Sequence, residues 1–509
     1  MKKRALLNFA ASLAYQFLNL LVGLIVPKFY TEIFGSVYNG LNQSVSQIMS
    51  LLSVLQFGIA AASIQQMFKS IADNDTDTIS AIYWDAGKQY RKMGYIFIGV
   101  VIPVIVFFPF IIKDNLTYFT VIAFLLFRTI SSAMEYFFQA KYSVILIANN
   151  KTYAIYTINI VLLVLNTVLH LIVLFTIKNI IVYQAVAVVT TLVRLLIVST
   201  YVRKKFPYLY KKPQKKVELP KENKRKDVLV SEIAGLVISS TDLLMLSTFS
   251  GLVYTSIYSV YSFVTSGLGN VLSSCREAVF AGLGKLFHSD FNHFKKQFSD
   301  FESVYLFLMF YLYSTALLLF KPFVEVYTAK MDANYVYTFL PILFISEKLL
   351  VNLRIPSIVS INTAGHFKEV KNYAVIEAVI NLVLSLALVI PFGIYGVLIG
   401  TLAGAAYRTP ILIHYSSKNI IKRKQWKFWK KVLKWMPLFS AVAVASIIVP
   451  IKCSSLINWV ITAIVIAAIM LVVCIAWIFV FERNTFNEFI RIINNKFKKE
   501  KQINENSNT

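Results

Sequence analysis

The sequence predicts an all-α integral membrane protein with about 14 transmembrane helices. Its 509 residues are 57% hydrophobic and only 15% charged, whereas a soluble protein carries roughly 25% charged residues. The apolar residues also come in blocks of about 20, the length that a helix needs to cross a bilayer core. These blocks are 5–27, 38–65, 93–112, 116–140, 153–176, 179–200, 228–249, 253–280, 301–320, 334–360, 372–391, 394–416, 432–451 and 456–481.

The positive charge of the chain is distributed unevenly between the predicted loops. The formal net charge is +26, and 38 of the 51 Lys and Arg residues fall in the loops and tails on the side of the N-terminus. The loops on the other side carry 6. Lys and Arg collect in cytoplasmic loops, so we expect both termini to be cytoplasmic. The same rule accounts for the charge without a nucleic-acid partner.

Several other functions are disfavoured by the motifs. The first apolar run, 5–27, is too long for a typical signal peptide and predicts a retained helix. The three cysteines form no CxxC pair, and there is no Walker sequence, so we expect no metal, no cofactor and no ATP hydrolysis. The predicted outside loops are short, the longest being about 321–333, which argues against an enzyme such as a polysaccharide polymerase or ligase.

Two basic stretches divide the chain. "RKKFPYLYKKPQKKVELPKENKRK" (203–226) contains three prolines and predicts a cytoplasmic linker, and "SSKNIIKRKQWKFWKK" (416–431) predicts an interfacial helix with Trp and Lys at headgroup level. The expected parts are an N-terminal six-helix lobe (1–202), the linker (203–227), a C-terminal six-helix lobe (228–416), a basic interfacial link (417–431), helices 13 and 14 (432–481) and a basic cytoplasmic tail (482–509).

The two sets of six helices look like a repeat. "GSVYNGLNQSV" (35–45) resembles "TSIYSVYSFVT" (255–265) at an offset of 220 residues. An even number of helices per unit gives both halves the same orientation, so the repeat is parallel, as in some transporters. The charged positions that match are Arg128 and Glu135 with Glu347 and Arg354 at an offset of 219, and Arg194 with Arg408 at 214.

Arginines within the predicted helices are the candidate substrate contacts. Ionisable residues there are costly and normally face the bundle interior or a wet cavity. A guanidinium stays charged and offers a planar fork of donors that suits phosphate, so several arginines predict an anionic, phosphorylated substrate. The alternative is buried ion pairing or snorkelling. The expected contacts, in falling order, are Arg276, Arg128, Arg194, Arg354 and Arg408.

The acids within the helices have two open interpretations. "ISSTDLLMLSTF" (238–249) holds one carboxylate, Asp242, in an otherwise uncharged stretch. Together with Glu135 and Glu347, this residue is expected either to pair with an arginine or to bind a coupling cation.

Four stretches carry a family resemblance that covers nearly the whole chain. They are "PKFYTEIFGSVYNGLNQSVSQIMSLLSVLQFGIAAA" (27–62), "SSTDLLMLSTFSGLVYTSIYSVY" (239–261), "INTAGHFK" (361–368) and "FGIYGVLIGTLAG" (392–404). On these the chain resembles a Wzx-type flippase for O-antigen or capsule repeat units, in the MOP superfamily that also holds MATE drug exporters and the lipid II flippase MurJ. Members commonly show Leu-Asp-Leu-Gly-Ile in the second helix, where this chain reads "LQFGI" with Gln56 at the acid's position.

The resemblance implies a V-shaped, MATE-like pair of six-helix lobes with two additional helices. By alternating access it would move undecaprenyl-diphosphate-linked oligosaccharide from the cytoplasmic to the outer leaflet of the bacterial inner membrane. Coupling to H+, Na+ or the membrane potential and a polysaccharide polymerase as partner are expected. The alternative is a MATE-like cation-coupled drug exporter, whose cavity should be acidic or apolar.

Overall fold

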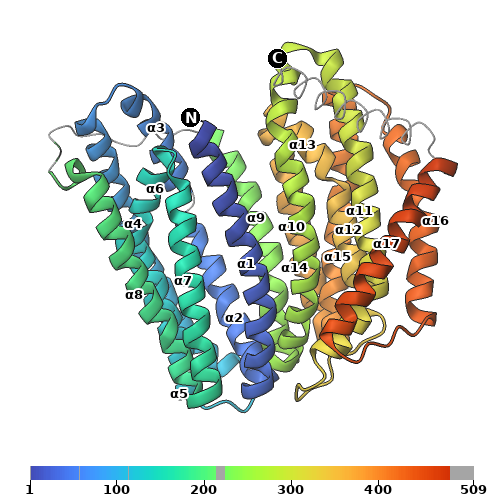
Figure 1. The fold of residues 1–509 in the computed structure, drawn as a ribbon, viewed down its shortest axis with the longest axis horizontal. Coiled ribbons are helices and arrows are strands. Elements are labelled where there is room, and N and C mark those ends of the chain that lie inside the picture. Colours follow the sequence, from blue (N-terminus) through green and yellow to red (C-terminus); the bar gives the residue numbers. More distant parts are fainter. Residues whose placement is uncertain (1, 57, 113, 212, 214–223, 482–509) are drawn as a thin grey trace, which may run out of the picture. The chain divides into compact units, whose positions relative to one another are not determined.

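The computed structural model describes residues 2–56, 58–112, 114–211, 213 and 224–481, and the secondary structure within these ranges consists of helices joined by loops and turns (Figure 1). Eleven helices within these ranges are long and apolar enough, by length and composition, to cross a membrane. The predicted fold class, a multi-pass all-α membrane protein, is confirmed. Residues 214–223 of the predicted linker and the predicted tail 482–509 lie outside the described ranges.

The first half of the chain contains eight α-helices joined by short 3-10 and π-helical segments. In order they are α1 (Lys2–Phe34), α2 (Ser36–Leu52), η1 (Ser53–Gln56), α3 (Ile59–Ala72), α4 (Thr76–Ile111), α5 (Tyr118–Met134), η2 (Glu135–Gln139), α6 (Ala140–Ala148), α7 (Thr152–Ile172), η3 (Val173–Ile177), α8 (Ile180–Lys205) and η4 (Pro207–Tyr210).

The second half follows the same plan and adds two helices. Its elements are α9 (Lys224–Met245), η5 (Leu246–Ser250), α10 (Leu252–Ser289), α11 (Phe291–Tyr327), α12 (Leu340–Leu353), α13 (Ile355–Ala364), α14 (Phe367–Phe392), α15 (Ile394–Tyr415), η6 (Ser416–Ile420), α16 (Trp426–Ile448) and α17 (Leu456–Phe481). Residues 421–425 form no helix, and Trp426 already begins α16, so the link 417–431 holds no separate interfacial helix.

The helix boundaries support the predicted repeat. Thr76 begins α4 and Phe291 begins α11, an offset of 215 residues, and Thr152 and Phe367 begin α7 and α14 at the same offset. Ile180 and Ile394 begin α8 and α15 at 214. Every predicted apolar segment overlaps one helix or one run of consecutive helices, although 334–360 begins before the first residue of α12, Leu340. Several helices extend well past the apolar segment, because polar residues near the membrane surface continue the same helical turns.

Two predicted segments are interrupted by identifiable residues. In 38–65 the chain leaves the helix at Gly58, whose φ of 82° is left-handed and costs little without a Cβ. Gln56 lies at the end of η1, just before this break. In 334–360 the helix breaks at Arg354, because Pro356 has no N–H to bond the carbonyl of Asn352 and its ring crowds that carbonyl.

The helices form two compact units, each with its own packing. The first comprises 1–259, 330–333 and 386–397; the second comprises 260–329, 334–385 and 398–509. In the first unit α1 packs on α7, α5 on α8 and α2 on α9. In the second unit α11 contacts α12, α16 and α17.

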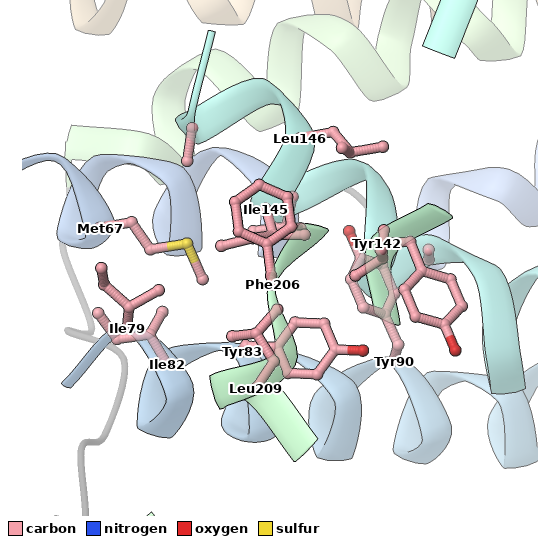
Figure 2. Close-up of a cluster of buried hydrophobic side chains, with 14 of the residues drawn as sticks. Met67, Ile79, Ile82, Tyr83, Tyr90, Tyr142, Ile145, Leu146, Phe206 and Leu209 are labelled. Atoms are coloured by element: carbon pink, nitrogen blue, oxygen red, sulfur yellow. The ribbon is translucent and has the colours of Figure 1, made fainter. Parts of the chain in front are cut away.

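A buried cluster in the first unit fixes the start of the linker. Figure 2 shows Phe206 and Leu209 pointing toward Tyr83 of α4 and Ile145 of α6. Trp84 adds a hydrogen bond from its indole Nε1 to the Leu209 carbonyl at 2.9 Å. The predicted linker is therefore anchored to the helices over its first residues.

A close helix approach in the same unit requires glycine. A Cβ added to Gly40 of α2 would lie 1.9 Å from the carbonyl oxygen of Leu252, the first residue of α10. Backbone occupies that position, so no side-chain rearrangement can make room.

Gly40→Val is therefore expected to destabilise the protein by about 1–3 kcal/mol or more, since overpacking forces the backbone to shift. The measurement is the thermal unfolding midpoint of the purified protein in detergent. Gly99→Val on α4 is the matched control, because a Cβ there meets nothing within 4 Å. Equal midpoints for the two variants would contradict the close approach.

Candidate functional site

Two aspartates cap helices of the opposite repeat. The Asp332 carboxylate, in the loop between α11 and α12, accepts from the Ser36 N–H at 2.9 Å and so caps α2. Asp114, in the loop between α4 and α5, accepts from the Leu252 N–H at 2.7 Å and caps α10. Each loop thus binds the start of the second helix of the other half. Carboxylates are favourable there because they meet unpaired N–H groups and the positive end of the helix dipole.

The capped helix starts match in backbone geometry as well. Gly35 and Gly251, which precede the two helices, have φ of 93° and 103°, values that L side chains rarely adopt. The Asn39 amide also donates to the Ser256 hydroxyl at 2.7 Å, joining α2 to α10. Our sequence analysis missed these caps, although an acid at equivalent positions of two outside loops was a usable signal.

Removing both caps is expected to loosen the contact between α2 and α10. With the native cysteines replaced, a cysteine introduced at Ser256, which is fully buried, should become more reactive toward an impermeant maleimide in Asp114→Ala/Asp332→Ala than with both aspartates present. Loss of a cap costs about 0.5–2 kcal/mol, enough to raise the reactive population several-fold. Asp75→Ala removes the cap that Asp75 provides to Thr78 in α4 and serves as control. Unchanged labelling would contradict the prediction.

Arg128 of α5 is a half-buried cation held by neutral groups. Its Nη2 donates to the side-chain Oδ1 of Asn42 in α2 at 3.0 Å, and the Gln184 amide of α8 donates to the same oxygen at 3.4 Å. Tyr183 and Tyr30 lie nearby, and within the part of the chain that the structure describes its Nε has no hydrogen-bond partner. Among the described residues no carboxylate lies within 4.0 Å of this guanidinium.

The surroundings of Arg128 suit an anion. A charge removed from water without a counter-charge costs several kcal/mol, and amide and hydroxyl dipoles offset that cost only in part. An incoming phosphate would supply the missing charge and fork-shaped acceptors. Phosphate binding by Arg128 stays a prediction, and the structure adds the neutral partners that the sequence did not identify.

Arg194 of α8 and Glu135 line one small polar cavity in the first unit. Its volume of about 10 Å3 fits roughly one water, and Gln139, Ser143 and Asn159 complete its polar lining. Gln139 is buried, and its Oε1 has no hydrogen-bond partner. Glu135 and Gln139 bound the π-helical segment η2, and such segments are frequent at functional sites.

Arg354 and Arg408 of the second unit share one carboxylate. Arg354 Nη1 lies 2.6 Å from Glu377 Oε1, and Arg408 Nη1 lies 2.8 Å from Glu377 Oε2. Glu377 is 2% exposed and Arg354 is 7% exposed. The single Glu377 carboxylate compensates one of the two guanidinium charges, so one net positive charge is left among α12–α15. Both Nε atoms have no hydrogen-bond partner. The structure favours the ion-pairing alternative for these two arginines.

The other predicted site residues, Arg276, Glu347 and Asp242, have three different kinds of partner. Arg276 of α10 has a 35% exposed side chain and a 3.6 Å contact with the exposed Glu277. Glu347 of α12 is buried beside Lys348, with Nζ at 3.0 Å. Asp242 of α9 is buried and accepts from the Tyr258 hydroxyl at 2.8 Å. Neither pair of residues spaced by seven, 128 with 135 or 347 with 354, forms a direct ion pair.

No group of three or more His, Cys, Asp or Glu side chains that could hold a metal ion occurs among the described residues. The polar clusters are instead built from arginines, amides and tyrosines. In the second unit, for example, Tyr305 donates to Asn352 at 3.0 Å, and Asn352 donates to Tyr313 at 2.9 Å.

Comparison with known proteins gives a clear structural likeness. No protein-family model and no curated protein matches the chain. The lipid II flippase MurJ, in its inward closed conformation, matches with a TM-score of 0.63 and 15% identity over 94% of this chain and 99% of MurJ. An inward-facing multidrug MATE transporter of the MOP superfamily matches with a TM-score of 0.58 and 11% identity, over 82% and 94%. A mutant of the Vibrio cholerae MATE transporter VcmN matches with 0.55 and 13%, over 86% and 98%. The chain therefore has the fold of these transporters.

Proposed function

We propose that the protein is a MOP-superfamily flippase that moves undecaprenyl-diphosphate-linked oligosaccharide repeat units to the outer leaflet of a bacterial inner membrane. The observation that carries the proposal is Arg128, a half-buried guanidinium whose Nε is enclosed and which has no carboxylate partner among the described residues. Such a group favours an anionic cargo over a cationic one. The shared fold with a lipid flippase supports the same class of substrate.

In this proposal the diphosphate contacts Arg128, whose Nε has no hydrogen-bond partner among the described residues. Arg276 of the second unit, which ranks first from the sequence, is a separate candidate contact with a 35% exposed side chain. Arg194 contributes through the small polar cavity beside Glu135. Arg354 and Arg408 act through their shared Glu377, so they hold the helices rather than the cargo. Alternating access would open the cargo site first to one side of the membrane and then to the other. Both termini would be cytoplasmic, and a polysaccharide polymerase would receive the product.

A MATE-like, cation-coupled drug exporter is the second candidate. Asp242 favours it, because a buried carboxylate next to the Tyr258 hydroxyl can bind or exchange a cation. The same residue serves the flippase proposal if the driving force is an H+ or Na+ gradient. The candidates therefore differ in the charge of the cargo and not in the coupling.

Deletion of the gene in its host separates the two. The flippase proposal expects undecaprenyl-diphosphate glycans to accumulate in the cytoplasmic leaflet and the surface polysaccharide to be lost. The exporter proposal expects unchanged glycan lipids and a greater accumulation of cationic dyes such as ethidium.

A further inference from the structure

The basic residues at the start of α16 lie in two different environments. Arg423 and Lys431 turn inward to α11, whereas Lys424, Lys427 and Lys430 are exposed. The proposed transport does not use this stretch. It also lies in the part of the chain from 378 to 481 that contains no Asp or Glu.

Arg423 and Lys431 attach the start of α16 to α11 through ion pairs with one glutamate. Glu302 of α11 is 1% exposed and accepts from both terminal guanidinium nitrogens of Arg423, Nη1 and Nη2, with Nη1 to Oε1 at 3.0 Å. Lys431 Nζ lies 3.2 Å from the same carboxylate and 2.8 Å from Ser303 Oγ. Phe428 is fully buried on this side. The start of α16 therefore has one orientation relative to α11.

This orientation turns a lysine face outward, which we define as Lys424, Lys427 and Lys430 together with Trp426. The three lysines are spaced by three residues and are exposed, and the Lys427 N–H bonds the Lys424 carbonyl at 3.1 Å, so Lys424 lies in the turn that leads into α16. Trp426 is 55% exposed. Within the described residues, none of these three ammonium groups has a carboxylate within 4.0 Å.

The lysine face lies where the lipid-facing surface begins. Trp426 is the first residue of a candidate membrane span that ends at Ile448. Exposed apolar side chains follow along the helix, including Leu433, Val444 and Ile448. Trp477 of α17 donates its indole N–H to the Lys434 carbonyl at 3.0 Å, about two helical turns beyond Trp426. Tryptophans and basic residues are typical of the membrane–water interface.

We propose that the lysine face binds the phosphate groups of anionic phospholipids in the adjacent leaflet. Three unpaired ammonium groups complement anionic headgroups in charge, and Trp426 supplies the amphipathic ring that sits at their depth. Each basic residue near an anionic surface strengthens its attraction, and salt weakens it. The proposal does not depend on which cargo the protein carries.

The test measures binding of phosphatidylglycerol to the purified full chain in detergent, with phosphatidylcholine as the neutral reference. Lys424→Gln/Lys427→Gln/Lys430→Gln should weaken phosphatidylglycerol binding at least tenfold and leave phosphatidylcholine binding unchanged. The control is Lys88→Gln/Lys285→Gln/Lys296→Gln, which removes the same charge from exposed lysines on α4, α10 and α11.

Two results would overturn the proposal. One is an equal loss of affinity in the control, which would mean that net charge alone attracts the lipid. The other is phosphatidylglycerol binding by the unaltered protein that does not weaken as NaCl is raised from 50 to about 500 mM, since exposed charge pairs are screened over that range. The salt titration needs no variant, so a folding defect cannot obscure it.

Discussion

Glu377→Gln is expected to destabilise the protein by about 3–5 kcal/mol, the cost of removing one partner from a buried ion pair. Glu377 is the only carboxylate within 4.0 Å of Arg354 and Arg408 among the described residues. Its neutralisation leaves two guanidinium groups facing each other where Arg354 is only 7% exposed. The thermal unfolding midpoint in detergent should fall by several degrees.

Glu369→Gln is the matched control, because this glutamate is exposed on the same helix, α14. Adding Arg354→Gln to Glu377→Gln should recover part of the lost stability, since one of the two uncompensated charges is then removed. A Glu377→Gln midpoint within a degree of the unaltered protein would show that the shared carboxylate does not hold α12, α14 and α15 together.

Arg128→Gln is expected to have the opposite profile, in which transport is lost and stability is kept. A hydrogen bond to a charged group contributes about 1.5–3 kcal/mol, so translocation of the lipid-linked oligosaccharide should fall roughly 10- to 100-fold. The free energy of unfolding should stay constant or rise, because the uncompensated guanidinium is itself costly to bury.

The readouts are translocation in proteoliposomes and the thermal midpoint of the same preparation. Arg203→Gln, at the exposed end of α8, controls for lost positive charge. Arg128→Lys should recover only part of the activity, since an ammonium lacks the planar fork. Normal translocation by Arg128→Gln would remove Arg128 from the binding site, and a large loss of stability would assign it a structural role.

The fold could be predicted because membrane burial leaves a strong record in the sequence. Blocks of about 20 apolar residues locate the helices, and the distribution of Lys and Arg predicts their orientation. The repeat was visible because equivalent residues such as Arg194 and Arg408 keep nearly constant offsets. The exact helix ends were not predictable, since α4 begins at Thr76 and α11 at Phe291, well inside polar sequence that continues the helical hydrogen bonds.

The pairing of the charged residues could not be predicted, because it depends on which helices are neighbours. Residues seven apart share a helix face, yet they lie about 10 Å apart along the axis. Arg354 therefore pairs with Glu377 of α14 instead of with Glu347 of its own helix. The ion pair between Arg423 and Glu302 could not be predicted for the same reason, since 121 residues separate the two partners in the sequence.

The helix caps show a third limit of sequence analysis. Asp114 and Asp332 lie in short loops where an acid is unremarkable, and each caps a helix more than 130 residues away. The sequence signal for these caps was that the two aspartates occupy equivalent loops of the two repeats. Breaks such as Gly58 were equally hidden, because glycine also occurs inside continuous membrane helices, as Gly267 and Gly269 do in α10.

The central claim is that the cargo is an anionic, diphosphate-linked lipid. Its most direct test is a proteoliposome assay with the purified chain, in which a fluorescent undecaprenyl-diphosphate oligosaccharide starts in one leaflet and its arrival in the other is followed by an impermeant quencher. We expect protein-dependent translocation that excess undecaprenyl diphosphate inhibits and that cationic dyes do not affect. Transport of the dyes, with no movement of the lipid above protein-free liposomes under any ion gradient, would contradict the claim and support the drug-exporter alternative.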